Sequence, residues 1–443
     1  MPALQTVSVE IRPGAGPLRP AKTRPSRFEL ALLFCVLILF SEGVLPRLVA
    51  AEETAEGSPI LRLVWLPIYA MALVGLFWQA RQTMSALMRQ PFLVALMGLG
   101  GLSFLWSIDP ALSQRRGLAI VMTIIAGVAI AVRYDWRTLL RMLGLVWLTV
   151  AVLSSLTALL NPSFGVMDAI HVGAWKGLYY EKNQLGGHMA RAAFLFTFLA
   201  VMDRPWRRLW IVALGLAVLL VLATTSKTSL LGLLLGQAVI AIAWVMKRGR
   251  IFGLSTVWIG ALVGGLFLGT LIFSPDVIFA VLGRDPSLTG RTDIWAVLLD
   301  KINDRPWLGY GYGAFWTLES EPAYWVREVL DWEAPTAHNG WLEVAIALGL
   351  VGLACLVLDF LMTLARAVWV SIGSWTGVFA LGVCAQFILF SLSESISMQQ
   401  NAMTWLTYVM VATKLAVAPK GSTPLRPLKV RRPLRSLSAD GPV

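Results

Sequence analysis

Apolar runs long enough to cross a lipid bilayer recur along most of this chain. A spanning helix needs about 20 mostly apolar residues, and many stretches between short polar segments reach that length. Charged residues make up only 14% of the sequence, against roughly 25% in soluble globular domains, while 57% of it is hydrophobic. A membrane β-barrel would instead show segments of about 10 residues with alternating hydrophobicity, and we see none. The sequence therefore predicts an all-α integral membrane protein.

The apolar runs and the basic residues together predict a topology. The runs amount to about twelve transmembrane helices, and Lys and Arg gather in alternate connections and in both tails, which places both termini in the cytoplasm. The predicted parts are a disordered basic cytoplasmic tail (1–28), nine spans (29–273), a large periplasmic loop with short helices (274–339), three spans (340–414) and a second basic cytoplasmic tail (415–443). No small-residue cleavage site clearly follows the first run, so we expect a retained span and no cleaved signal peptide.

Charge and motif content exclude several classes of function. The net charge of +12 sits mostly in loops and tails on one side, which favours the positive-inside rule over nucleic-acid binding. Cys35, Cys355 and Cys384 each lie inside an apolar run, so neither a disulfide framework nor a metal site is expected. The sequence has no P-loop, no Gly-x-Ser-x-Gly and no Asp-x-Asp, which disfavours ATP chemistry and a metal-assisted nucleotide-sugar transferase. We expect no cofactor.

Several polar residues fall on the outer side of the membrane when the spans are made to alternate. Lys182 and Asn183 lie in Glu-Lys-Asn-Gln-Leu-Gly, Lys227 lies in Ser-Lys-Thr-Ser between two spans, and Glu394 lies in a predicted outer turn at 391–401. A lysine at an abrupt turn against the membrane is costly unless it is paired or hydrated. A phosphate is the functional partner and a snorkelling lysine the plain alternative. With Arg291 and His338, which fall on the same side, these residues predict one outward-facing site.

The large loop contains the other candidates. Arg291 opens a predicted amphipathic helix at the outer membrane interface, with one apolar face formed by Ile294, Trp295, Leu298, Leu299 and Ile302. A cation at a helix start opposes the helix dipole, which favours an anionic partner over a merely solvated arginine. Three glycines then form a predicted compact turn with aromatic residues that could stack on sugars or anchor at the interface: Trp307, Tyr310 and Tyr312.

His338 stands at the entry to a predicted span. Histidine titrates near neutral pH and can accept a proton from a hydroxyl group. The alternative is a helix-entry residue with only local hydrogen bonds. His171 and His188 also fall at or near the outer surface, so His338 is not unique.

An ordered set of motifs resembles the O-antigen ligase/polymerase superfamily over about residues 180–353. The motifs are EKNQLGGHMA, SKTS, GRTDIW, RPWLGYGYGAFW and AHNGWLEVAIALGLVG. The superfamily includes O-antigen ligases, Wzy-type polymerases and ExoQ-like exopolysaccharide polymerases, and the Lys-Asn-x-Leu-Gly element is most similar to the ExoQ-like members. The resemblance implies a GT-C-type glycosyltransferase of the bacterial inner membrane. Its donor is a glycan on undecaprenyl diphosphate at the periplasmic face, and it needs neither metal nor nucleotide.

The resemblance also implies roles for individual residues. Arg291 and His338 match the arginine and the histidine of the family's loop, while Lys227 stands where many members have arginine. Lysine keeps the charge there but lacks the bidentate fork. The expected catalytic residues are His338 and Arg291, with the diphosphate bound by Arg291, Lys227 and Lys182. The expected glycan-binding residues are Asn183, Trp307, Tyr310, Tyr312, Asn339 and Glu394.

The expected chemistry is metal-independent and inverting. Cations neutralise the charge that grows on the leaving diphosphate, and His338 accepts the proton of the attacking hydroxyl. We expect a polysaccharide polymerase first, with an O-antigen ligase acting on lipid A-core as the alternative. A chain-length regulator or export complex is a further candidate partner besides the bilayer; nucleic acid is not.

A non-enzymatic transporter is a second alternative. It would favour ionisable residues near the bilayer midplane and internal repeats. Arg191, Glu343 and Asp359 do lie within predicted spans, but no repeat is clear.

Overall fold

The computed structural model describes residues 25–44, 46–49, 59–169, 171–249, 291–330 and 334–417. Within these ranges every regular element is a helix, apart from one isolated bridge between Val166 and Trp175. Among the described residues, six helices are long and apolar enough to cross a membrane, and one bent pair would make a seventh. The all-α membrane fold is confirmed, whereas the count of about twelve spans and the GT-C assignment stay predictions. The predicted ninth span at 252–273, residues 274–290 of the loop and most of both tails lie outside the described residues.

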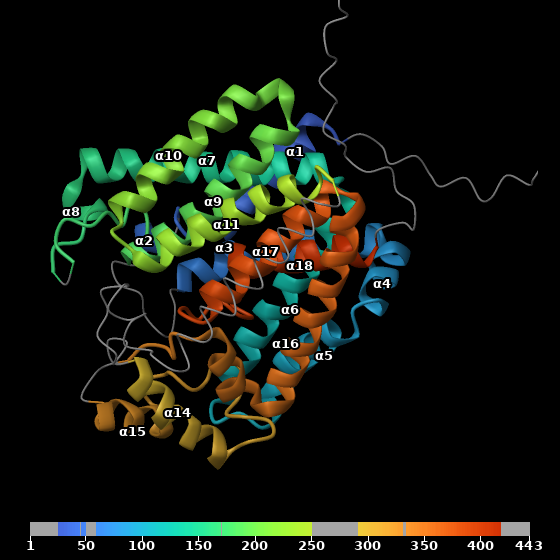
Figure 1. Cartoon of the computed structure of the whole chain (residues 1–443). Coiled ribbons are helices and arrows are strands. Elements are labelled where there is room, and N and C mark those ends of the chain that lie inside the picture. Colours follow the sequence, from blue (N-terminus) through green and yellow to red (C-terminus); the bar gives the residue numbers. More distant parts are fainter. Residues whose placement is uncertain are drawn as a thin grey trace, which may run out of the picture.

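The helices follow one another along the chain as labelled in Figure 1. They are α1 (Arg27–Phe40), α2 (Pro46–Val49), α3 (Pro59–Trp78), α4 (Ala80–Met88), α5 (Pro91–Leu102), α6 (Pro110–Arg133), α7 (Trp136–Leu160), α8 (Pro162–Gly165), α9 (Lys182–Met202), α10 (Arg207–Ala223), α11 (Lys227–Met246), α14 (Arg291–Asp304), α15 (Glu321–Leu330), α16 (Gly340–Gly373), α17 (Trp375–Ser391) and α18 (Met403–Ala416).

Short polar residues set where several helices begin. The side chains of Asp109, Asp135 and Ser226 accept hydrogen bonds from the first-turn amides of α6, α7 and α11, as N-caps do. Two boundaries differ from the predicted ones. Helix α9 begins at Lys182 and not near residue 187, so the Lys-Asn pair lies in its first turn and not in a loop. Helix α16 runs on to Gly373, beyond the predicted end near residue 366.

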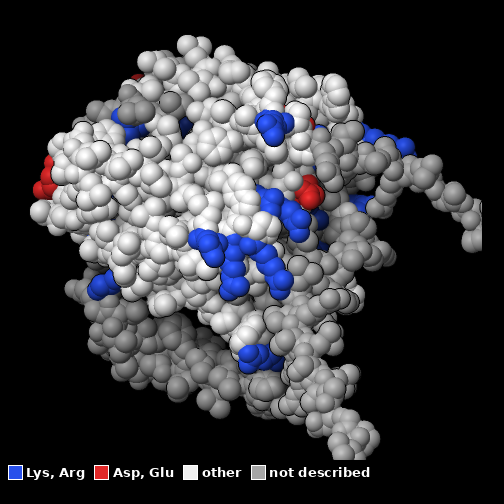
Figure 2. All heavy atoms as spheres, turned by 90° about the horizontal axis from the view of Figure 1, so that it is seen from above, with Lys and Arg blue, Asp and Glu red and all other residues white. Residues whose placement is uncertain are grey.

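One end of the bundle, here called the basic end, is rich in arginine. It holds the connections from α6 to α7 and from α9 to α10, with Arg133, Arg137, Arg141, Arg204, Arg207 and Arg208. The Arg141 guanidinium clamps the Asp203 carboxylate at 2.5 and 2.7 Å, and the Trp210 indole donates to the same carboxylate at 3.1 Å. Figure 2 shows Lys and Arg side chains gathered on the face seen from above. Such an uneven distribution is what the positive-inside rule describes.

Helix α16 is broken at Gly349, and the glycine-rich turn fills the break. Gly349 has φ +67° and ψ −170°, so the helical ladder stops there. The turn replaces it: Tyr310 N and Gly311 N donate to the carbonyls of Ile346 and Ala347 at 2.9 and 3.0 Å. On the other side of the break, Leu350 N donates to Pro306 O at 2.7 Å. The predicted compact turn is therefore confirmed. It separates a short first segment of α16 from the long membrane-spanning one.

That first segment of α16 belongs to a second, smaller hydrophobic core. Ile294, Leu298 and Ile302 of α14 are buried against Phe315 and against residues of α15 and α16. Figure 1 shows α14 and α15 at the bottom of the view, beside the lower part of α16. The apolar face of α14 thus packs on protein, where we predicted a helix lying on the lipid interface. Leu299, predicted on that face, is instead exposed, since it lies one position beyond the buried stripe.

Residues 391–402 form an irregular segment that enters the bundle. Asn401 accepts a hydrogen bond from the Tyr69 hydroxyl at 2.9 Å through its side chain, and its backbone amide donates to Thr123 Oγ1 at 2.9 Å. Both partners lie about halfway along their helices, α3 and α6. Irregular backbone at that depth is tolerated only where it is buried in protein or lines a water-filled cavity. The predicted outer turn is therefore an inserted connection between α17 and α18, and it carries Glu394.

Candidate functional site

The candidate residues lie at the end of the bundle opposite the basic end. We call it the loop end: here α9, α11 and α16 begin, and α7 and α17 stop. Lys182, the first residue of α9, is only 8% exposed, and its Nζ donates to Thr225 Oγ1 at 3.3 Å. Thr225 lies in the tight turn between α10 and α11 with φ +51°, two residues before Lys227. The structure thus brings the two predicted lysine motifs together.

A glycine makes this contact possible. A Cβ added at Gly186 would overlap Ser229 Oγ and would lie 2.8 Å from Thr224 Oγ1. Helix α9 can therefore lie directly against the start of α11 only because residue 186 has no side chain. The result is two adjacent helix N-termini, each opened by a lysine. Both the helix dipoles and the lysine charges favour an anion at this place.

His338 and Glu394 meet at the same end. Nδ1 of His338 lies 3.8 Å from Oε2 of Glu394, and their side chains are 25% and 26% exposed. His338 has φ +48°, in the left-handed region, where a non-glycine residue stores strain that is often found at functional sites. The imidazole is thus partly accessible and faces a carboxylate through one ring nitrogen.

Glu343 holds the two segments that carry this pair. Its Oε1 accepts from the backbone amide of Ala337 at 2.6 Å and from the Ser395 hydroxyl at 3.0 Å. These two donors are the neighbours in sequence of His338 and Glu394. Oε2 accepts from the Trp316 indole at 3.1 Å. One carboxylate in the first turn of α16 therefore joins the loop before α16 to the segment after α17.

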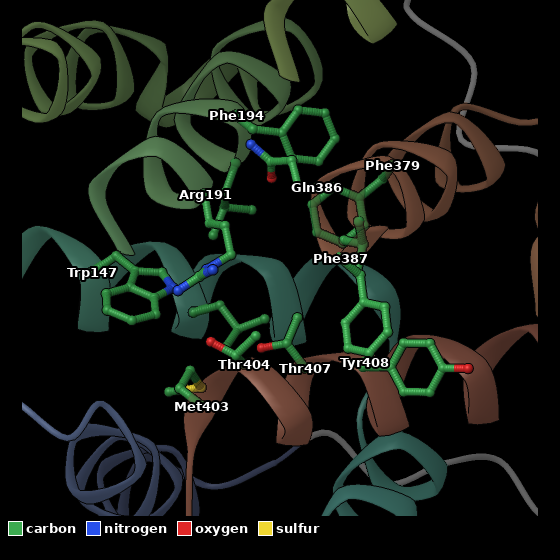
Figure 3. A pocket seen from close by; sticks show the side chains of 13 residues that line it. Trp147, Arg191, Phe194, Phe379, Gln386, Phe387, Met403, Thr404, Thr407 and Tyr408 are labelled. Atoms are coloured by element: carbon green, nitrogen blue, oxygen red, sulfur yellow. The ribbon is translucent and has the colours of Figure 1, made fainter. Parts of the chain in front are cut away.

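Behind Glu394, a buried arginine lies inside the bundle. The charge of Arg191 interacts with the carboxylates of Glu42 and Glu394, and its guanidinium lies 4.7 Å from the centre of the Phe390 ring. Its Nη2 is 3.0 Å from His188 Nδ1. Figure 3 shows Arg191 extending toward Trp147 in a pocket of about 50 Å³ between α7, α9, α17 and α18. Ligand pockets usually measure about 300–1,000 Å³, so this is an internal gap and not a glycan site.

His188 is part of the same buried group. Its ring is stacked between Trp147 and Tyr179, at centroid distances of 5.0 and 4.9 Å. Its Nε2 lies 3.9 Å from Glu42 Oε2. Burial raises the pKa of the Tyr179 hydroxyl well above its usual value, so this hydroxyl stays a neutral donor to Ser41 O, 2.9 Å away. His188 is therefore a packed residue and not a second exposed base.

Three of the predicted glycan-binding residues have structural positions instead. Tyr310 and Tyr312 are 4% and 7% exposed, so their faces cannot stack on a sugar. The hydroxyl of Tyr310 donates to Lys301 O, and that of Tyr312 to Met398 O; burial raises the pKa of both tyrosines. Asn339 is the N-cap of α16, and its side chain accepts from the amides of residues 341 and 342. These predictions missed that the glycine turn and the loop before α16 are packed elements.

Two other residues predicted to bind glycan, Trp307 and Asn183, are accessible in the structure. Trp307 is 69% exposed and lines a surface hollow of about 270 Å³ together with Trp106. Asn183 is partly exposed in the first turn of α9. Arg291 is the first residue of α14 as predicted, but its side chain lies outside the described part of the chain. Their roles stay predictions.

Glu42, Arg191 and Glu343 were not predicted as site residues. An ionisable residue inside an apolar run indicates function. This signal was noted for Arg191 and Glu343, but no role was assigned to them. Glu42 lies just after α1 and has no such signal in the sequence. Within the described ranges, no three His, Cys, Asp or Glu side chains are grouped as a metal site would require.

Comparison with known proteins gives matches to proteins of glycan assembly. Residues 211–357 match the family model described as O-antigen ligase. The chain is 29% identical over 271 residues to the exopolysaccharide production protein ExoQ of Rhizobium meliloti, covering 58% of this chain and 60% of that protein. It is 25% identical over 260 residues to an O-antigen ligase of Pseudomonas aeruginosa, covering 58% and 54%. The chain thus matches little more than half the length of each relative.

Proposed function

Because the chain is a member of the O-antigen ligase/polymerase superfamily, we propose that it is a membrane glycosyltransferase. It transfers a glycan from undecaprenyl diphosphate to the hydroxyl of an acceptor sugar. The reaction takes place at the loop end, which faces the periplasm, in the bacterial inner membrane with both termini in the cytoplasm. The observation that carries the proposal is the set of residues at this end. The partly accessible His338 lies there beside the Glu394 carboxylate, and so do two helix N-termini that begin with lysine.

The lysine side of the site binds the diphosphate. Lys182 and Lys227 begin adjacent helices, where the peptide dipoles add to their charge. Arg291, at the start of α14, is the third cation. Charge grows on the diphosphate as its bond to the sugar breaks, so fixed cations at this place stabilise the transition state more than the ground state.

The histidine side activates the acceptor. The acceptor oxygen attacks the anomeric carbon while the bond from that carbon to the diphosphate oxygen breaks. The hydroxyl proton passes to the imidazole of His338. Undecaprenyl diphosphate leaves with the bond electrons, and attack from the opposite side inverts the anomeric centre. No step needs a metal ion.

Among the possible acceptors, a growing polysaccharide chain is the first choice. The relative that matches at 29% identity is named for exopolysaccharide production, which favours a polymerase. The relative named as an O-antigen ligase keeps transfer to lipid A-core as the alternative. Trp307 and Asn183 are the accessible candidates for glycan contacts. A chain-length regulator or export complex would act on the product of a polymerase.

The test is an assay with purified protein and undecaprenyl-diphosphate-linked repeat units from the host, in the presence of EDTA. Longer lipid-linked chains from donor alone identify a polymerase, and product that needs lipid A-core identifies a ligase. We expect His338→Ala to lower turnover by about 10²–10⁴-fold, the usual contribution of a general base. Arg291→Ala should lower turnover at saturating acceptor as well. Donor movement across liposomes without any turnover would refute the proposal and favour the transporter.

A further inference from the structure

We propose that Glu394 is the positioning residue for His338. Its carboxylate holds the imidazole so that Nδ1 carries a proton and Nε2 faces the acceptor hydroxyl. The inference rests on the proposed function and adds to it a second residue, which acts through His338 and not on the substrate.

The first observation is the pair itself. The contact joins Nδ1 of the ring to the carboxylate, with 3.8 Å between Nδ1 and Oε2. This separation is longer than a hydrogen bond, but contacts between a base and its orienting group are often loose before substrate binds. A carboxylate beside Nδ1 favours the tautomer with hydrogen on Nδ1, because the other tautomer would set a lone pair against negative charge. In that tautomer the lone pair that can accept a proton is on Nε2, the other ring nitrogen.

The second observation is that the structure fixes both partners independently of substrate. Glu343 accepts from Ala337 N and from Ser395 Oγ, so the residues next to His338 and Glu394 are bound to one oxygen atom. A hydrogen bond from each of two chain segments to one acceptor limits how far the segments can separate. The 3.8 Å approach is therefore built into the scaffold and is not an incidental surface contact.

The third observation concerns the charged neighbours of Glu394. The guanidinium charge of the buried Arg191 interacts with the carboxylates of Glu394 and Glu42. An ionised carboxylate near apolar surroundings needs such a partner. Glu343 and His338 also interact electrostatically. The carboxylate of Glu394 thus interacts with the charge of a buried arginine and lies beside the imidazole of His338.

The role follows from the proton balance of the transfer step. The acceptor hydroxyl loses its proton to Nε2, and the ring becomes an imidazolium with hydrogen on both nitrogens. Glu394 stabilises that cation without accepting a proton itself. Neutralising Glu394 should therefore slow the chemical step while leaving donor binding to the lysine side unchanged.

The experiment compares wild type with Glu394→Gln, Glu394→Asp, His338→Ala and the Glu394→Gln/His338→Ala double variant. Glu328→Gln, an exposed glutamate on α15, is the matched control. With the in vitro assay we expect Glu394→Gln to lower kcat about tenfold to hundredfold, part of what a general base contributes. The KM for the lipid-linked donor should change by less than about twofold, because only the base is affected. Glu394→Asp should recover part of kcat.

The double variant separates positioning from a structural role. If Glu394 acts only through His338, Glu394→Gln should have no further effect in the His338→Ala background, since coupled residues are not additive. A multiplicative loss in the double variant, or a kcat of wild-type size for Glu394→Gln, would overturn the inference. In either case an inactive His338→Ala variant would leave the proposed function standing. An active His338→Ala variant would instead refute the general base itself.

Discussion

Replacing Glu343 with glutamine should disrupt the site in a way that a second substitution repairs. The carboxylate accepts three hydrogen bonds: two at Oε1, from Ala337 N and Ser395 Oγ, and one at Oε2, from the Trp316 indole. Glutamine has the same shape but only one acceptor oxygen. If its oxygen keeps the two bonds at the Oε1 position, its NH2 group faces the indole N–H, donor against donor. In the reverse orientation the NH2 group would face Ala337 N and the Ser395 hydroxyl, so two hydrogen bonds would be affected.

The cost can be worked out from that geometry. A hydrogen bond to a charged group contributes about 1.5–3 kcal/mol, and leaving one partner unsatisfied in a buried place costs a similar amount. Because a single bond is lost and the other two weaken without the charge, we expect about 2–3 kcal/mol of destabilisation for Glu343→Gln. Trp316→Phe alone should also destabilise, since it leaves Oε2 without that donor. In the double variant the NH2 group faces an aromatic ring and the conflict of donors disappears.

The assay is thermal unfolding in detergent, followed by circular dichroism at one pH and lipid-to-protein ratio. The double variant should unfold at a higher temperature than Glu343→Gln, although it carries one more substitution. It should also regain part of the kcat that the single variant loses, because the loop of His338 and the segment of Glu394 are again held together. Strictly additive losses in the double variant would refute the clamp, as would a Glu343→Gln variant that unfolds like wild type.

Three further predictions concern the scaffold. Gly349→Ala should lower the free energy of unfolding by about 3 kcal/mol or more, or prevent folding, because an added Cβ would overlap the glycine turn at a positive φ. The control is Gly98→Ala, which has open space around it and should unfold within a few degrees of wild type. Tyr312→Phe should lower the unfolding temperature by an amount equivalent to about 1–3 kcal/mol, because a buried backbone carbonyl loses its donor, and wild-type thermal stability would contradict this. Burial acts to raise the pKa of Asp203, but the hydrogen bonds from Arg141 and from an indole bring it below its usual value. The resulting stabilisation is present above the unfolded pKa of about 4 and is lost as pH falls through the lower folded value, so acid below about pH 4 should lower the unfolding temperature of wild type more than that of Asp203→Asn.

The sequence predicted the elements whose signals are local. Apolar runs predicted a helical membrane protein, and three glycines predicted the turn that the structure shows between α14 and α15. His338 was predicted as a catalytic residue from its type and from its place before a span, and that role stays a prediction. Asn339 has an N-cap side chain immediately before a helix, which is also a local signal. We nevertheless interpreted it as a glycan ligand, because the resemblance drew attention to the motif and not to the cap.

The rest depends on contacts between distant segments. Gly349 lies in an uninterrupted apolar run, where a glycine is usually tolerated within a helix. No neighbouring residue in the sequence indicates that α16 breaks there or that another segment supplies the missing backbone hydrogen bonds. The approach of Glu394 to His338 has a similar origin, because it needs Glu343 to join two loops. Tyr310 and Tyr312 were assigned to sugar binding because exposed and buried aromatic residues look alike in a turn motif. Burial distinguishes them, and burial is a property of the packed chain.

The inserted segment at 391–402 affects the order in which the site is assembled. Ribosomes synthesise a chain from its N-terminus, so the helices that carry Tyr69 and Thr123 enter the membrane long before Asn401 exists. The connection that binds them, and Glu394 with it, arrives only with the last two helices. A nascent or C-terminally truncated chain would contain His338 and both lysine motifs and still lack a complete site. If the proposed function is correct, glycan transfer can begin only after the segment that carries Glu394 and Asn401 has been synthesised and packed.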